Sequence, residues 1–158
     1  MNLDPLHPMI VHLPVALVAL LPLFTAIALL DVGRGAPVRR SWRTIVILQT
    51  ILSLSAWAAV ETGENDEDYY EHGSAEEALE SHEDLAEVFQ VFTLAALPLA
   101  VAGLFAGRLG WMARYAFGAA TIILLVMGAM VGHRGGAIIY PEGAQATAEK
   151  LVGTATHH

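Results

Sequence analysis

The sequence predicts an all-α protein: an integral membrane bundle of four antiparallel helices, with both termini on the outer, periplasmic side. Of its 158 residues, 55% are hydrophobic and 15% charged. The mean hydropathy is +0.52, which is too apolar for a soluble domain of this size. The apolar residues gather into four blocks, each near the length needed to cross a hydrocarbon core of roughly 30 Å. We therefore expect the lipid bilayer to surround most of the chain.

The first two spans are expected at 9–30 and 42–60. No Lys or Arg precedes the first apolar run, which is also longer than the apolar region of a signal peptide, so we expect this span to be retained. Pro22 falls near its middle, where a proline removes a backbone donor and kinks a helix. The short connection to the second span makes the two helices antiparallel.

The third and fourth spans are expected at 88–106 and 111–131, after an acidic outer loop over 61–87. In the middle of that loop, Ser74 to Glu77 matches a capping box, so the third helix should begin well before the membrane. Pro98 is a second expected kink. Gly-x-x-x-Gly pairs at 103–107 and 128–132 favour close helix approach. The spans make one membrane domain, 1–143, followed by a mobile tail, 144–158.

The charges predict the orientation of the bundle. Six of the eight basic residues are assigned to the two short connections: Arg34, Arg39, Arg40 and Arg43 in the first, Arg108 and Arg114 in the second. The positive-inside rule makes these connections cytoplasmic. The acidic loop holds twelve of the sixteen acidic residues and no basic one. We therefore expect a multi-pass protein of the bacterial inner membrane with its N-terminus outside.

Every span carries ionisable residues at its outer end. In chain order these are His7 and His12, Glu61 and Glu64, His82 and Glu83, and His133. Ionisable groups at a membrane boundary are costly and tend to mark functional sites. A single boundary histidine can equally be a capping or snorkelling residue. His72 is interpreted as a solvated loop residue, and the terminal His157 and His158 are set aside.

Two of these positions stand out. His12 lies about one turn inside an apolar segment, where a neutral imidazole needs partners. His133 is followed by Gly135 and Gly136, which permit a helix end and leave room for a flat or bulky group beside the histidine. A plain helix stop would explain these glycines equally well.

The absence of cysteine excludes disulfides, iron–sulfur clusters and covalently attached haem. Two cofactor hypotheses remain. The first is a b-type haem with His12 and His133 as axial ligands, His7 and His82 as a reserve pair, and Glu61 and Glu83 orienting imidazoles. The second is a zinc, iron, manganese or copper ion in a binding or transport module, held by members of a His/Glu set. That set comprises His12, His82, His133, Glu61, Glu64 and Glu83.

A third hypothesis is a non-catalytic subunit of a larger membrane complex, whose polar residues tie the helix ends together. The acidic loop is interpreted either as a solvated segment or as a docking surface for a basic periplasmic electron carrier. Quinone is the other expected redox partner. Enzymatic activity has little support, since no nucleophile–base set, phosphate-cradling loop or HExxH motif is present. The net charge of -8 opposes nucleic-acid binding.

Two end motifs resemble a known family. The stretch 6–17, LHPMIVHLPVAL, is similar to the opening LHPxxVHFPIAL of the bacterial membrane proteins grouped as domain of unknown function 2231. The stretch 132–140, GHRGGAIIY, resembles their closing GHxGGxLVY. Between them, Thr62-Gly63 and His82 fall where the family tends to place a Thr-Gly turn and a histidine.

The resemblance implies a four-helix membrane domain whose relatives are sometimes joined to cytochrome c or Rieske-type domains, and so points to respiratory electron transfer. It implies ligand roles for His7, His12, His82 and His133. The chain departs from many relatives at 141–143, where Pro-Glu-Gly stands in place of a frequent His-Gly. A ligand at that later position is therefore not implied here.

Overall fold

The computed structural model describes the backbone over residues 6–64 and 76–139 and the side chains over 11–62 and 81–135. Within these ranges the regular structure is entirely helical. The four helices are α1 (Leu6–Gly33), α2 (Val38–Glu64), α3 (Glu76–Ala102) and α4 (Gly107–Ile139). The predicted all-α fold with four long helices is thus confirmed. Ser74 and the tail 144–158 lie outside the described residues.

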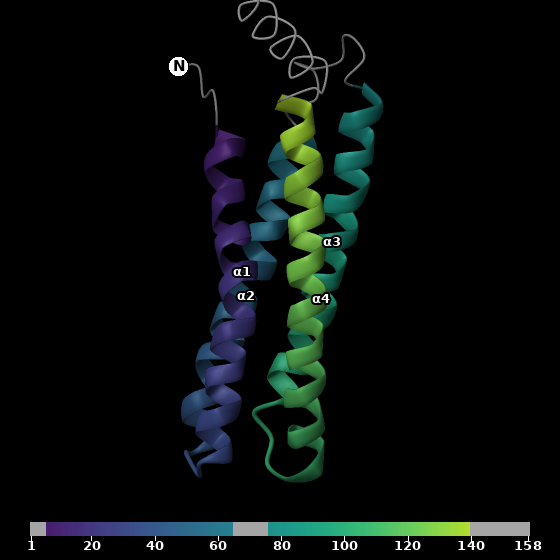
Figure 1. Cartoon of the computed structure of the whole chain (residues 1–158). Coiled ribbons are helices and arrows are strands. Elements are labelled where there is room, and N and C mark those ends of the chain that lie inside the picture. The colour runs from purple at the N-terminus through teal and green to yellow at the C-terminus, as the bar shows by residue number, and fades with distance from the viewer. Residues whose placement is uncertain (1–5, 65–75, 140–158) are drawn as a thin grey trace, which may run out of the picture.

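The helices form a ring in which each contacts the next along the chain and α4 closes on α1. They alternate in direction, so α1 begins, α2 ends, α3 begins and α4 ends at the same end of the bundle (Figure 1). We call this the histidine end, because His12, His82 and His133 lie towards it. The opposite end, with the connections at 34–37 and 103–106, is called the arginine end.

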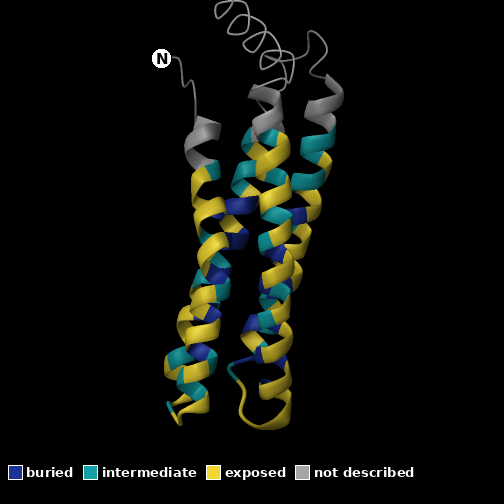
Figure 2. Ribbon diagram, viewed as in Figure 1, coloured by how far each residue is buried: buried dark blue, intermediate teal, exposed yellow. Residues whose placement is uncertain are grey.

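All four helices are long and apolar enough to cross a membrane. Only 17–28% of the residues in the most apolar stretch of each helix are buried inside the bundle. The remaining faces expose large apolar side chains along their length, including Leu23, Leu54, Val91 and Ile122, and exposed positions recur along α1 and α4 in Figure 2. A contiguous apolar surface of this extent needs a cover of lipid. The bundle therefore fits a multi-pass membrane protein.

The helices extend beyond the predicted apolar spans. For α3 this was expected from the capping box, and the helix begins at Glu76, well before its span. Arg39, Arg40, Arg43, Arg108 and Arg114 lie within helices, so their assignment to connections was wrong, and only Arg34 of the six lies in a connection. The true first connection is only Arg34 to Pro37, because Gly35, with φ of 93°, ends α1 tightly in a Schellman motif.

Tight packing at the arginine end centres on Trp42 of α2, which is fully buried. Its Nε1 donates a hydrogen bond to the backbone oxygen of Ala100 at 2.8 Å. The indole lies against Gly103, where any Cβ would overlap it, and meets Phe117 edge-on with the ring centroids 5.9 Å apart. One residue of α2 thus holds the end of α3 and the start of α4 together.

Arg114 completes this end of the bundle. Its guanidinium is buried on α4 and donates to the backbone oxygens of Gly103 at 2.7 Å and Phe105 at 3.2 Å. The last carbonyls of a helix have no intrahelical partner and carry partial negative charge, so a cation there is stabilising. Arg114 therefore caps the C-terminus of α3. The number of basic residues in a segment does not reveal this structural role.

The two Gly-x-x-x-Gly pairs each contribute one glycine to packing. Gly103 accommodates Trp42, and a Cβ at Gly128 would come within 2.8 Å of Val18 on α1. A Cβ at Gly107 or Gly132 would meet nothing within 4 Å. Gly107 instead supplies a positive φ of 76° at the start of α4. The expectation of close approach holds for one member of each pair.

Candidate functional site

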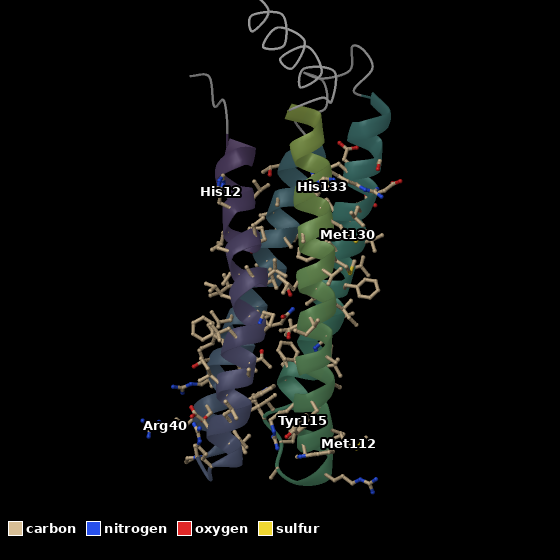
Figure 3. All side chains as sticks on the ribbon, in the orientation of Figure 1. His12, Arg40, Met112, Tyr115, Met130 and His133 are labelled. Carbon is tan, nitrogen blue, oxygen red and sulfur yellow. The ribbon has the colours of Figure 1, made fainter. Side chains whose placement is uncertain are left out.

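His12 and His133 lie on neighbouring helices at the histidine end. His12 is in the second turn of α1 and His133 is near the end of α4 (Figure 3). Both side chains are exposed. Just below them α1 and α4 come close together, since Gly128 of α4 leaves no room for a side chain beside Val18. The first predicted pair therefore sits on helices that are already held in contact.

His82 of α3 is placed differently, because its imidazole lies over Gly135 of α4. A Cβ at Gly135 would stand 3.0 Å from Cε1 of His82 and 3.5 Å from Nδ1. The glycine thus allows the imidazole to settle against the backbone of the neighbouring helix. The structure brings together a predicted histidine and a predicted glycine whose contact the sequence did not indicate.

This contact corrects the expectation for Gly135 and Gly136. Neither ends α4, which continues to Ile139, and neither has the positive φ of a helix stop. The space beside Gly135 is taken by His82 rather than left for a flat group. The open position in this segment is Gly132, where a Cβ would meet nothing within 4 Å.

Arg134 adds a second tie between α3 and α4. Its Nη1 donates to the backbone oxygen of Ser81 at 2.9 Å and to the Ser81 hydroxyl oxygen at 2.6 Å. These bonds are exposed, so water competes with them and their net contribution is small. Together with the contact of His82 with Gly135, they connect α3 to α4 at the histidine end.

The carboxylates complete this end. Glu61 is exposed near the end of α2, and Glu83 is half-buried on α3. His12, Glu61, Thr62, His82 and Glu83 each take part in a further hydrogen-bonding, ring or electrostatic interaction. The side chains of His7 and Glu64, and the whole of His72, lie outside the described residues.

Among the described side chains, no group of three or more histidines and carboxylates is arranged to hold a metal ion. A hexacoordinate or tetrahedral ion centre needs such a group, whereas the iron of a b-type haem needs only two imidazoles from the protein. The ion-binding set His12, His82, His133, Glu61, Glu64 and Glu83 thus remains a sequence-based prediction.

A cluster of buried polar side chains was not identified from the sequence. Deep within the bundle, side chains from all four helices are at most 2% exposed despite being polar: Thr25, Gln49, Ser53, Thr93 and Thr121. A signal was present, because uncharged polar residues interrupt each apolar span. Interpreting it required the rotational phase of every helix, which decides whether such a residue faces lipid or the interior.

No protein-family model, curated protein or solved structure matches the chain.

Proposed function

We propose that the chain is an electron-transfer module of the bacterial inner membrane that holds a b-type haem at its histidine end, with this end facing the periplasm. The observation that carries the proposal is the placement of His12 and His133. Two exposed imidazoles lie on contacting helices at one end of a membrane bundle. That is the donor set a low-spin b-type haem requires.

The local packing supports the choice of this pair over the reserve pair. The imidazole of His82 is seated on Gly135, where it helps to fix α3 against α4. Gly132, one residue before His133, has open space where a side chain would stand. His12 and His133 would hold the haem, and the group would supply one-electron transfer. Glu61 and Glu83 would orient the imidazoles from behind.

The partners proposed for this site follow from its position. A haem near the periplasmic face of the inner membrane is within reach of a quinone from the bilayer and of a soluble carrier from the periplasm. The segment 61–87 contains twelve acidic residues and no Lys or Arg, a composition that favours a basic carrier. Docking of this kind should weaken steeply as the salt concentration rises.

The test is a dithionite-reduced minus air-oxidised visible spectrum of the purified full chain, with elemental analysis of the same sample. We expect the α band of a low-spin b-type haem. It should be lost in His12→Ala and in His133→Ala and retained in His82→Ala. Loss in His82→Ala with retention in His12→Ala would reassign the ligands to the reserve pair.

A structural role in a larger membrane complex is the second candidate. The bonds from Arg134 to Ser81 and the seating of His82 on Gly135 favour it, because both connect helices. In that case the spectrum shows no haem and elemental analysis finds no bound metal. A featureless spectrum with stoichiometric zinc, iron, manganese or copper would instead support the metal-binding module.

A further inference from the structure

A belt of buried polar side chains crosses the bundle well away from the histidine end. It contains Thr25 of α1, Gln49 and Ser53 of α2, Thr93 of α3 and Thr121 of α4, each at most 2% exposed. Figure 3 shows nitrogen and oxygen atoms between the helices part-way along the bundle. We call these five residues the polar belt. It contains no histidine or carboxylate and is separate from the proposed haem site.

Most of the belt is internally satisfied. Gln49 donates from Nε2 to the backbone oxygen of Thr93 at 2.7 Å, and the Ser53 hydroxyl donates to the same oxygen at 3.1 Å. The Thr121 hydroxyl donates to the backbone oxygen of Gly118, within its own helix, at 2.7 Å. These bonds fix the Gln49 amide, because its NH₂ group must face the Thr93 carbonyl.

Two atoms of the belt lack a partner among the described residues. They are the Oε1 atom of Gln49 and the hydroxyl oxygen of Thr25, and both are sealed from solvent. Buried polar groups in proteins nearly always have a hydrogen-bond partner, and an unpaired one in a membrane interior is especially costly. A hydrogen-bonding partner that the described residues do not supply would remove this cost.

The two atoms belong to neighbouring helices at a similar depth. Thr25 lies eight residues before the end of α1 at Gly33, and Gln49 lies eleven after the start of α2 at Val38. At about 1.5 Å of rise per residue, these positions are roughly 12 and 16 Å from the arginine end. Helices α1 and α2 contact each other, and both side chains face the interior, since neither is more than 1% exposed.

The surroundings limit what the ligand can be. Apolar side chains at most 1% exposed flank Thr25 and Gln49, with Leu21 and Leu124 towards the histidine end and Ile45 towards the arginine end. A bulky molecule does not fit between such layers. A cation is disfavoured, because no carboxylate belongs to the belt and an unpaired charge in this interior is very costly. A small neutral hydrogen-bonding molecule remains.

We propose that one water molecule is bound in the polar belt, donating a hydrogen bond to Oε1 of Gln49 and joined by a second to the hydroxyl of Thr25. The Gln49 oxygen and the Thr25 hydroxyl are suitable hydrogen-bond partners for one water molecule. Oε1 only accepts, whereas the hydroxyl both donates and accepts. Buried waters typically serve otherwise unsatisfied groups in this way. The bound water makes Thr25 and Gln49 energetically dependent on each other without direct contact.

A double-mutant cycle on the full chain in detergent tests this dependence. Thr25→Val removes the hydroxyl while keeping the shape, and Gln49→Leu removes the amide. We expect the two changes to be non-additive by at least about threefold in the unfolding equilibrium constant, as is usual for coupled sites. The matched control is Thr121→Val with Gln49→Leu, which should be additive, because the Thr121 hydroxyl is satisfied within its own helix. Additivity in both cycles would overturn the proposal.

A direct measurement covers the case in which Gln49→Leu does not fold. In the wild-type chain, NMR should show a nuclear Overhauser contact between water protons and the Gln49 side-chain amide. This contact should be reduced at least severalfold in Thr25→Val and be unchanged in Thr121→Val. Its absence from the wild type would overturn the proposal even if the cycle showed coupling, because the coupling would then have another origin.

Discussion

The two ends of the bundle hold their helices together by different means. At the arginine end the connecting groups are buried: Trp42 is fully enclosed and Arg114 is 5% exposed. At the histidine end, His12, His133 and Arg134 are all exposed. A buried hydrogen bond is costly to break, because its partner is left without water, whereas an exposed one is replaced by solvent. The comparison indicates that stability is concentrated at the arginine end, whereas these side chains of the histidine end are open to solvent.

Truncating Trp42 should produce the largest loss of stability. Trp42→Ala leaves a cavity beside Gly103 and Phe117 and removes the bond to Ala100. Large-to-small core changes of this kind cost about 3–5 kcal/mol in soluble proteins. The transfer part of that cost is smaller where lipid is the alternative environment, so we expect about 3 kcal/mol. Thermal unfolding in mild detergent, followed by circular dichroism, measures the change.

The matched control for this change is Trp57→Ala on the same helix. Trp57 is 52% exposed, so its removal creates no cavity and should cost less than about 1 kcal/mol. Equal losses in the two variants would mean that burial of Trp42 does not organise the arginine end.

Arg114→Gln should give the next largest effect. It removes a charged donor from the carbonyls of Gly103 and Phe105 in a buried setting, and we expect a loss of about 2 kcal/mol in the free energy of unfolding. Arg108→Gln, six residues earlier on α4 and exposed, should change it by less than about 0.5 kcal/mol. Equal free energies of unfolding for the two variants would contradict the role of Arg114 in capping the C-terminus of α3.

Alanine substitutions at Gly132 and Gly135, both at the histidine end, should differ in their smaller effects on stability. Alanine at either position gains up to about 1 kcal/mol of helix propensity. Gly132→Ala should keep this gain, because its Cβ meets nothing, whereas Gly135→Ala should lose it against the imidazole of His82. We therefore expect Gly132→Ala to be the more stable variant by about 1 kcal/mol.

The background His82→Ala sharpens this comparison. Without the imidazole the difference between the two glycine variants should disappear in the same unfolding assay. If the difference persisted, another neighbour of Gly135 would be responsible, and the seating of His82 would not be what determines the spacing of α3 and α4.

Much of the fold could be predicted from the sequence, because lipid imposes length and apolarity on each span. The four helices, their antiparallel order and the early start of α3 follow from those constraints and one capping motif. Contacts between helices could not be predicted, since they depend on the rotation of each helix about its axis. The roles of Trp42 and Gln49 could therefore not be predicted, although Gln49 interrupts an apolar span. Gly135 was expected to end a helix, whereas it receives the imidazole of His82.

The candidate site shows the same limit. The sequence indicates that histidines gather at one end of the bundle, and the structure places His12 and His133 there on contacting helices. It also shows that Arg114 is a buried capping residue rather than part of a connection, a distinction that a charge count cannot make. Which imidazoles face a common ligand depends on side-chain direction, which a sequence does not specify.

We propose that stability and haem binding belong to opposite ends of the molecule. The most direct measurement is the haem content of His12→Ala and Arg114→Gln, taken from the reduced minus oxidised visible spectrum at a temperature where both variants are folded. We expect His12→Ala to lose the α band and to melt at the temperature of the haem-free wild-type chain, and Arg114→Gln to keep the band while melting earlier than the haem-loaded wild type. Retention of the band in His12→Ala, or its absence from the wild-type chain, would contradict this assignment.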